Sequence, residues 1–370
     1  MPSSEFPIQV FAGASALAVV RDEGLHPERV RVVLGAAGGP KWLVLSAMDR
    51  ELFGHWLQNS GGQPLFLLGS SIGAWRFAAA CRKKPAAALS QFLDAYIHQR
   101  YSLRPTPDEI SAEAVRIQQR FVSPEGVREI LTHPRFRLNI VAARCRWPLS
   151  SRRTPLQAMG VAVAAAGNLA SPRLLRLLCE HVIFADSRDT APFGFRLGAG
   201  RRVPLQENNL RQALRASGAI PLVMRGVRNI AGAPDGTYRD GGILDYHMAV
   251  RTSMATGEVA LFPHYTDRIT PGWLDKKLPW RSAGASATDS VVMIAPSRDF
   301  VRNLPLGRIP DRNDFYWFKG RDEERFSCWK QVVEASERMA GAFFDAVHSG
   351  AIRHIVRPFP AARDLFRRLP

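Results

Sequence analysis

A candidate serine nucleophile lies in segment 69–73, which reads GSSIG. The apolar run 65–68 before it predicts a buried strand, and the alanine-rich run after it predicts a helix. A G-x-S-x-G sequence between a strand and a helix is the pattern of a nucleophile elbow. In such an elbow, Gly69 and Gly73 would permit a turn too sharp for side chains. Ser71 would then be held out at the edge of the sheet.

A glycine-rich loop precedes this elbow by one helix and one strand. Segment 31–35 predicts a short apolar strand, and it runs directly into AAGGPK at 36–41. Parallel strands bring their carboxyl ends to the same edge of a sheet, so this loop is expected beside Ser71. The backbone amides of Gly38 and Gly39 could then bind an oxyanion. The loop lacks the spacing of a P-loop or of G-x-G-x-x-G, which disfavours nucleotide binding.

Two interpretations of the catalytic base are open at this point. The usual base of a serine hydrolase is a histidine, and the order Ser71, Asp240, His264 would suit such a triad. His247 is a second candidate histidine, although two more strands are predicted beyond it and hydrolases of this type place the base after the last strand. The other interpretation makes Asp240 itself the base, because it begins a D-G-G loop. A bare D-G-G sequence is more often only a turn.

The composition is that of a soluble globular protein. The chain has 370 residues, of which 46% are hydrophobic and 22% are charged. Its four cysteines form no C-x-x-C pair, so neither a zinc site nor a disulfide framework is predicted, and no metal or cofactor is expected. No internal repeat or clear linker divides the chain, which favours a single domain spanning 1–370.

The net charge of +17 indicates either an anionic partner or a generally basic surface. No single block of five like charges is present, which favours the generally basic surface. No nucleic-acid-binding motif is present, so no nucleic acid partner is expected, and an anionic membrane surface is the partner that stays open. The apolar stretch 10–20 has no basic residue before it and is followed by Arg-Asp-Glu, unlike a signal peptide. No apolar run is long enough for a transmembrane helix. These features predict a cytoplasmic protein, at most peripheral to the membrane.

The order of predicted elements is typical of an α/β fold with a mostly parallel central sheet. Segment 144–180 has two interpretations, a buried pair of helices or an apolar cap beside the site that touches lipid. Predicted helices cover 8–25, 42–58, 71–81, 86–101, parts of 104–135, 206–217 and 322–349. Predicted strands cover 31–35, 65–68, 136–143, 182–185, 259–263 and 291–296, with a hairpin at 227–238 and a long loop at 264–290.

Four short motifs in one order make the chain resemble the patatin-like phospholipase family. They are the glycine loop at 38–41, G-x-S-x-G at 69–73, ASGAIP at 216–221 and D-G-G at 240–242. The resemblance covers about 31–245, with 100–205 as a variable, partly helical insertion or cap. Segment 246–370 adds the C-terminal strands and the long helix. The resemblance implies a single three-layer patatin-like α/β domain with a nucleophile elbow and helical insertions.

The resemblance also implies a serine–aspartate dyad without a histidine, metal or cofactor. Ser71 would attack the carbonyl of a lipid ester, and Asp240 would accept the serine proton. The amides of Gly38 and Gly39 would bind the oxyanion, and Lys41 would steady their loop or favour an anionic headgroup. The supporting positions are Gly69, Gly73, Gly241 and Gly242. The implied activity is that of a lipid acyl hydrolase with a lipid ester as its substrate.

This chain departs from the family pattern in its glycine loop. Ala36 and Ala37 replace an aspartate and a glycine, which could change the geometry of the oxyanion site because alanine adopts fewer conformations. Trp42 replaces a further glycine and either narrows the acyl pocket or is buried. Two other functions stay open: a conventional Ser–His–Asp esterase, and a non-catalytic lipid-binding protein that keeps the scaffold.

Overall fold

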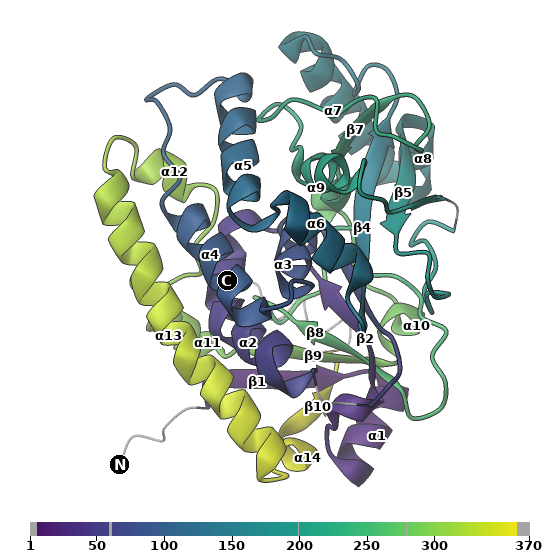
Figure 1. Ribbon diagram of the computed structural model, residues 1–370, viewed down its shortest axis with the longest axis vertical. Helices are drawn as coiled ribbons and strands as arrows, with labels where there is room; N and C mark the ends of the chain where they lie inside the picture. The colour runs from purple at the N-terminus through teal and green to yellow at the C-terminus, as the bar shows by residue number, and fades with distance from the viewer. Residues whose placement is uncertain (1–5, 59–60, 199, 279, 361–370) are drawn as a thin grey trace.

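The computed structural model describes residues 6–58, 61–198, 200–278 and 280–360. Within these ranges the strands form one ten-stranded sheet in the order β10-β1-β9-β8-β2-β3-β4-β5-β6, with β7 also paired to β4 (Figure 1). Six of the nine pairings among these strands are parallel and three are antiparallel. The predicted α/β class with a mostly parallel central sheet is therefore confirmed.

The strands and helices have the following bounds. The strands are β1 Ile8–Ala12, β2 Val30–Gly35, β3 Leu65–Ser70, β4 Phe136–Cys145, β5 Cys179–Ala185, β6 Arg201–Pro204, β7 Thr237–Asp240, β8 Val259–Pro263, β9 Val291–Pro296 and β10 Val356–Pro358. The α-helices are α1 Ala14–Glu23, α2 Ser46–Glu51, α3 Ile72–Ala80, α4 Pro85–Ile97, α5 Pro107–Phe121, α6 Pro124–Thr132, α7 Thr154–Ala170, α8 Leu175–Leu178, α9 Leu210–Gly218, α10 Ala285–Thr288, α11 Arg298–Arg302, α12 Asp314–Trp317, α13 Asp322–His348 and α14 Ile352–Ile355. The short 3₁₀ or π turns are η1 Pro27–Arg29, η2 Gly39–Leu45, η3 Leu52–Trp56, η4 Pro172–Leu174, η5 Gly241–Ile243 and η6 Trp273–Asp275.

The prediction of one helix over 8–25 is wrong. Residues 8–12 form strand β1, which pairs with β9 and β10, and the helix α1 starts only after Gly13. A Cβ atom at Gly13 would lie 1.9 Å from the carbonyl oxygen of Thr288, so the junction passes too close to the backbone for a side chain. The apolar run 10–20 thus serves a buried strand first and a helix second.

Three other expectations also need correction. The helix predicted over 42–58 is divided into η2, α2 and η3, with different helical pitch in each. The predicted hairpin at 227–238 is reduced to one bridge between Val227 and Tyr238, because β7 pairs with β4 instead. Segment 144–180 is not a buried helix pair, since α7 buries only a few of its residues. The strands β6 and β10 were not predicted, and both are short.

Helix α3 packs directly against the ends of β2 and β3. A Cβ atom on Gly73 would lie 2.1 Å from the carbonyl oxygen of Gly35, and one on Gly69 would lie 2.5 Å from the amide nitrogen of Ala74. A Cβ atom on Gly35 would meet the ring of Phe77 at 2.6 Å. These approaches exclude side chains, as predicted for Gly69 and Gly73, and they determine where α3 begins relative to the sheet.

Different segments cover the two faces of β3 and β4. On the face that carries Gly69, the ring of Phe53 in η3 packs edge-on against Phe136, with 5.8 Å between ring centroids. On the opposite face, Phe66 meets Phe193 from the irregular segment after β5, with 6.3 Å between centroids. The sheet is therefore buried on both faces, although long loops supply part of one cover.

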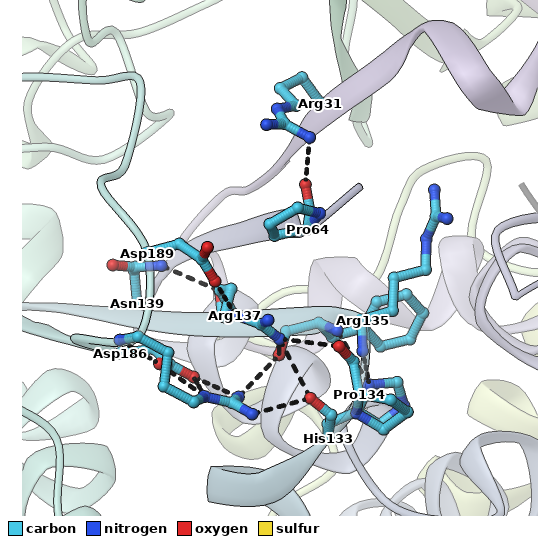
Figure 2. Close-up of polar contacts among 11 residues, drawn as sticks. Arg31, Pro64, His133, Pro134, Arg135, Arg137, Asn139, Asp186 and Asp189 are labelled. Carbon is cyan, nitrogen blue, oxygen red and sulfur yellow. Dashed lines mark hydrogen bonds and ion pairs between the residues drawn. The ribbon is translucent and has the colours of Figure 1, made fainter. Parts of the chain in front are cut away.

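A polar network occupies the beginning of β4, at the end of the strand away from Ser71 (Figure 2). Arg137 Nε donates a hydrogen bond of 2.5 Å to Asp189, and its Nη1 donates one of 3.1 Å to the carbonyl of His133. Nearby, Arg31 Nη1 donates to the carbonyl of Pro64 at 2.9 Å, just before β3. These arginines tie the loops at this end of the sheet to the strands they enter.

Some features of other protein classes are not found in the described ranges. None of the helices there combines the length and apolar character that crossing a bilayer requires. Nor do three or more His, Cys, Asp or Glu side chains of those residues gather as metal ligands would. The four cysteines are free and buried, although Cys145 and Cys179 lie on paired strands with 3.3 Å between their sulfur atoms.

The buried ion pair between Asp49 and Arg76 joins α2 to α3 and generates a stability prediction. Its two N–O distances are 2.5 and 2.6 Å, and both side chains are buried. Asp49→Asn is expected to lower the free energy of unfolding by about 3–5 kcal/mol, because it leaves the guanidinium uncompensated. Urea unfolding followed by circular dichroism measures this loss. Arg29→Ala, which breaks a solvent-exposed pair with Glu23, should lose less than about 1 kcal/mol. Equal losses in both variants would contradict the prediction.

Candidate active site

Ser71 stands at the sharp junction between β3 and α3. Its backbone has φ 53° and ψ −125°, a conformation that residues with side chains rarely adopt. The close packing of α3 on β2 and β3 holds the residue in this conformation. Its hydroxyl Oγ donates a hydrogen bond of 2.7 Å to Oδ2 of Asp240, and the residue is only 7% exposed. The local structure is the elbow that the G-x-S-x-G spacing predicts.

Asp240 is the last residue of β7, which pairs antiparallel with β4. Its second carboxylate oxygen, Oδ1, accepts a hydrogen bond of 2.7 Å from the amide of Gly242. Burial raises the pKa of this carboxyl group above its ordinary value, and the hydrogen bonds from Ser71 and Gly242 partly oppose that rise. A Cβ atom on Gly241 would lie 2.4 Å from the carbonyl oxygen of Val141, so this glycine is needed for β7 to end close to β4.

Ser217 is a further residue of the site for which the sequence suggested no role. It lies near the end of α9, within the ASGAIP segment. Its Oγ accepts a hydrogen bond of 2.8 Å from the amide of Ser71 and donates one of 2.6 Å to the carbonyl of Val141. The hydroxyl therefore connects the elbow to β4. The match of 216–221 to a family motif was the signal that could have identified it.

The glycine loop lies beside Ser71. Gly39 has φ 57°, which favours glycine, and a Cβ atom on Gly38 would lie 2.7 Å from the hydroxyl of Tyr265. Among the described residues, neither glycine amide has a hydrogen-bond partner, so both remain available to an anion. Ala37 fits its position without a positive φ, and its amide donates to the carbonyl of Tyr246 at 2.9 Å. The replacement of glycine by alanine there is thus accommodated.

Trp42 is part of the core and lines neither cavity of the site. Its ring stacks on Phe92 with 4.9 Å between centroids, and the residue is 1% exposed. Of the two interpretations of this residue, burial is therefore confirmed and a narrowed acyl pocket is wrong.

His247 and His264 are buried beneath the glycine loop and do not contact the serine–aspartate pair. The Tyr265 hydroxyl donates to the carbonyl of Ala37, so His247 Nε2 donates to that hydroxyl at 2.8 Å. Its Nδ1 accepts from the amide of Thr270 at 2.9 Å. Burial lowers the pKa of both histidines, which fits neutral rings. In the described part of the chain, no histidine is hydrogen-bonded to Ser71 or Asp240.

Six of the predicted site residues, but not Gly69, Gly73 or Gly241, line one cavity of about 260 Å³, which we call the polar cavity for its charged side chains. Its lining includes Ser71, Asp240, Gly38, Gly39, Lys41 and Gly242. Two cations not identified from the sequence, Lys276 and Arg312, line the same cavity. They come from irregular segments after β8 and before α12, and no motif marks them.

The cations of this cavity are crowded. Burial is the main cause that lowers the pKa of Lys41, and the nearby Arg312 adds to it. The pKa of Lys276 is lowered to about 7, first by removal of solvent and then by Arg312 and Lys41, although part of the residue stays exposed. Asp311 is the carboxylate of the lining that opposes both shifts, together with Asp240 at Lys276. The lining therefore sets three basic side chains against two carboxylates beside Ser71, an excess of one positive charge when all five are ionised.

A second, larger cavity of about 680 Å³ also reaches Ser71 and Gly39. Its walls are mainly apolar and come from α3, α5, α12 and the segment 220–224. Representative lining residues are Trp75, Ile110, Ile117, Leu222, Met224 and Phe315. The nucleophile thus stands where a polar cavity and an apolar cavity join. Such an arrangement can hold the two unlike ends of an amphiphilic molecule on either side of the serine hydroxyl.

Comparisons with known proteins found little. No family model matches the chain, and no curated protein matches its sequence. One solved structure that it resembles is that of the human GIVD cytosolic phospholipase A2, with 12% identity and a TM-score of 0.37. The alignment covers 92% of this chain and 64% of that one. A similarity this low carries no information about the chemistry of the chain, which rests on its own residues.

Ser217 provides a test of how the elbow is held. Ser217→Ala leaves the Ser71 amide and the Val141 carbonyl without their partner, and it is expected to lower the free energy of unfolding by roughly 1–3 kcal/mol. Urea unfolding measures the loss. The matched control is Ser90→Ala, which removes an exposed hydroxyl bonded to a helix carbonyl and should change stability by less than about 0.5 kcal/mol. If Ser217→Ala is as stable as the control, Ser217 does not hold the elbow.

Proposed function

We propose that this protein is a patatin-like lipid acyl hydrolase that cleaves carboxylic esters through an acyl-enzyme at Ser71. The observation that carries the proposal is the 2.7 Å hydrogen bond from Ser71 Oγ to the buried carboxylate of Asp240. Ser71 lines both the polar and the apolar cavity, so an ester with one apolar arm can bind with its two ends in different cavities. A serine bonded directly to a carboxylate fits a two-residue catalytic unit.

Acylation begins with attack of Ser71 Oγ on the ester carbonyl carbon. A new C–O bond forms as the hydroxyl proton passes to Asp240 Oδ2. The carbonyl oxygen becomes an oxyanion, which the amides of Gly38 and Gly39 stabilise. When the tetrahedral intermediate collapses, the bond to the alcohol oxygen breaks. The alcohol leaves with the proton from Asp240, and the acyl group stays on Ser71.

Deacylation repeats these steps with water as the nucleophile. Asp240 removes a proton from the water, whose oxygen attacks the acyl carbon. The bond to Ser71 Oγ then breaks, and the serine oxygen recovers the proton. The raised pKa of Asp240 suits this role, because a carboxylate of ordinary acidity is a weak base toward a hydroxyl group.

The two cavities suggest the class of ester. An acyl chain gains free energy by leaving water for the apolar cavity. The leaving alcohol would then lie in the polar cavity, where Lys41, Lys276 and Arg312 attract a negatively charged group. A bound anion would also relieve the mutual repulsion of these three cations. The best substrate is therefore an acyl ester of an alcohol that carries a phosphate.

The catalytic roles are tested with two substitutions that change few atoms. Ser71→Ala and Asp240→Asn are each expected to lower kcat for a soluble acyl ester by at least about a thousandfold, because each removes a reacting group. Initial rates on a chromogenic ester, with circular dichroism to verify folding, measure the effect. A fluorophosphonate probe should label the unaltered protein and not Ser71→Ala.

The control for this test is His264→Asn, which should keep most of the activity if the protein stays folded. Loss of hydrolysis in folded His264→Asn with retained hydrolysis in Asp240→Asn would overturn the dyad. It would support a conventional triad instead. Failure of the probe to react with the unaltered protein would support a non-catalytic lipid-binding protein.

Substrate charge is tested with a matched pair, an acyl ester of glycerol phosphate and the same acyl ester of glycerol. Lys276→Gln should reduce the ratio of kcat/KM between the phosphate ester and the neutral ester by about tenfold. In the unaltered protein this ratio should fall as the pH rises through about 7, because Lys276 then loses its charge. Lys277→Gln, which changes a neighbouring exposed lysine, is the control. An equal ratio in both variants would exclude Lys276 as a determinant of specificity.

A further inference from the structure

Helix α7 distributes its side chains differently from an ordinary surface helix: it buries polar side chains and exposes large apolar ones. None of its 17 residues is charged, and the four that it buries are Gln157, Gly160, Ala164 and Asn168. Surface helices normally bury an apolar stripe and expose charged side chains. Here the two large polar side chains face the protein, and the apolar side chains of Met159, Val163 and Leu169 face outward.

Hydrogen bonds fix this orientation. Gln157 Oε1 accepts from the amide of Leu222 at 2.6 Å, and Asn168 Nδ2 donates to Asp275 Oδ1 at 2.7 Å. A Cβ atom on Gly160 would lie 2.6 Å from the amide nitrogen of Leu149, so the helix backbone approaches this segment closely. Helix α7 cannot rotate without breaking these contacts. The orientation of α7 is therefore fixed, and its outward face is part of the protein surface.

This outward face is apolar over α7 and is extended by exposed residues of the turn before α7 and of η4 and α8 after it. The six residues that we call the α7 face are Trp147, Met159, Val163, Leu169, Leu174 and Leu177, with exposed fractions of 66, 43, 49, 57, 41 and 66%. Single exposed apolar residues are common on soluble proteins, but a group of this kind marks a surface that binds something.

The charged residues of the segment that forms the α7 face all have one sign, and a nearby carboxylate, Asp108, is paired with Arg225. Segment 145–179 contains five arginines and no aspartate or glutamate. The arginines are exposed, and they are Arg146, Arg152, Arg153, Arg173 and Arg176. A second copy of this chain would bring like charges together, which disfavours self-association. The combination of exposed apolar side chains with flanking arginines is instead complementary to an anionic bilayer, which offers headgroup charge above an apolar interior.

The α7 face also lies next to the apolar cavity. Leu222, whose amide is bound by Gln157, is a lining residue of that cavity, and Trp273 belongs to η6, which contacts α7. In Figure 1, α7 and α8 lie together at one end of the molecule, and the long helix α13 runs along the other side. A surface resting on α7 and α8 would therefore lie beside one wall of the cavity.

We infer that the α7 face is a docking surface for an anionic lipid bilayer. Its apolar side chains enter the boundary between headgroups and acyl chains, and its arginines pair with lipid phosphates. Docking in this way places the apolar cavity near the lipids, so that an acyl chain can enter beside Leu222. That last step rests on the proposed hydrolase function, but binding to the bilayer does not.

The test uses the full chain carrying Ser71→Ala, so that no hydrolysis alters the vesicles. Cosedimentation measures binding to vesicles of phosphatidylglycerol and phosphatidylcholine in equal parts, and to vesicles of phosphatidylcholine alone. Strong binding to the first and weak binding to the second is expected. Added salt should weaken binding, since it screens the arginines.

Two multiple variants locate the surface. In the first, Val163→Thr, Leu169→Gln and Leu177→Gln are combined, and in the second, Arg173→Ser and Arg176→Ser. Each should lower the partition coefficient onto anionic vesicles by at least about tenfold. The control combines Lys330→Ser and Arg338→Ser on α13, which removes the same charge from another side of the molecule and should leave binding within about threefold. All the substituted positions are exposed, so folding should not change.

Three results would overturn the inference. The first is no binding to anionic vesicles. The second is binding that the control weakens as much as the α7 variants do, which would reflect net charge alone. The third is a dimer or larger assembly of the unaltered protein that does not form with the first variant. That result would make the α7 face a contact between copies of the chain. None of these results bears on ester hydrolysis in solution, so the proposed function would be judged separately.

Discussion

The contact between Gly73 and Gly35 is the constraint on which the site depends. A Cβ atom on Gly73 would lie 2.1 Å from the carbonyl oxygen of Gly35, so there is no room for a side chain. Helix α3 therefore begins directly over the ends of β2 and β3. That approach leaves Ser71 in its rare backbone conformation and directs its hydroxyl to the carboxylate of Asp240. The packing of α3 offsets the strain at Ser71, and the buried pair of Asp49 and Arg76 contributes by joining α3 to α2.

Hydrogen bonds from neighbouring residues hold the elbow and the glycine loop in place. Ser217 ties the Ser71 amide to β4, and Tyr265 holds the glycine loop while a neutral His247 orients Tyr265. Neither partner needs to react in order to matter. Their contacts keep the two glycine amides and the serine hydroxyl in fixed relation, which the proposed mechanism needs for electrostatic stabilisation of its transition state.

Local patterns in the sequence predict the strands β2, β3, β4, β8 and β9 and the helix α13 to within a few residues, because short apolar runs mark the strands and helical spacing of apolar residues marks α13. The motif residues Ser71, Asp240, Gly38, Gly39 and Lys41 can be identified from the sequence and line one cavity, whereas their catalytic roles stay a prediction. Lys276 and Arg312 could not be predicted, since they join the cavity through irregular loops. The strand β1 is mistaken for helix because the apolar run 10–20 has no period that separates the two. The proximity of Cys145 and Cys179 depends on strand pairing that no local pattern encodes.

Strand β1 has its own consequence for how the chain is made. Its neighbours in the sheet are β9 and β10, which residues 291–296 and 356–358 form. Strand β1 therefore leaves the ribosome well before either neighbour has been made. Until then its backbone amides and carbonyls are an open template for any other extended chain. Pairings between such distant segments also form slowly. The nascent chain therefore carries β1 without its full pairing until both C-terminal strands have been made.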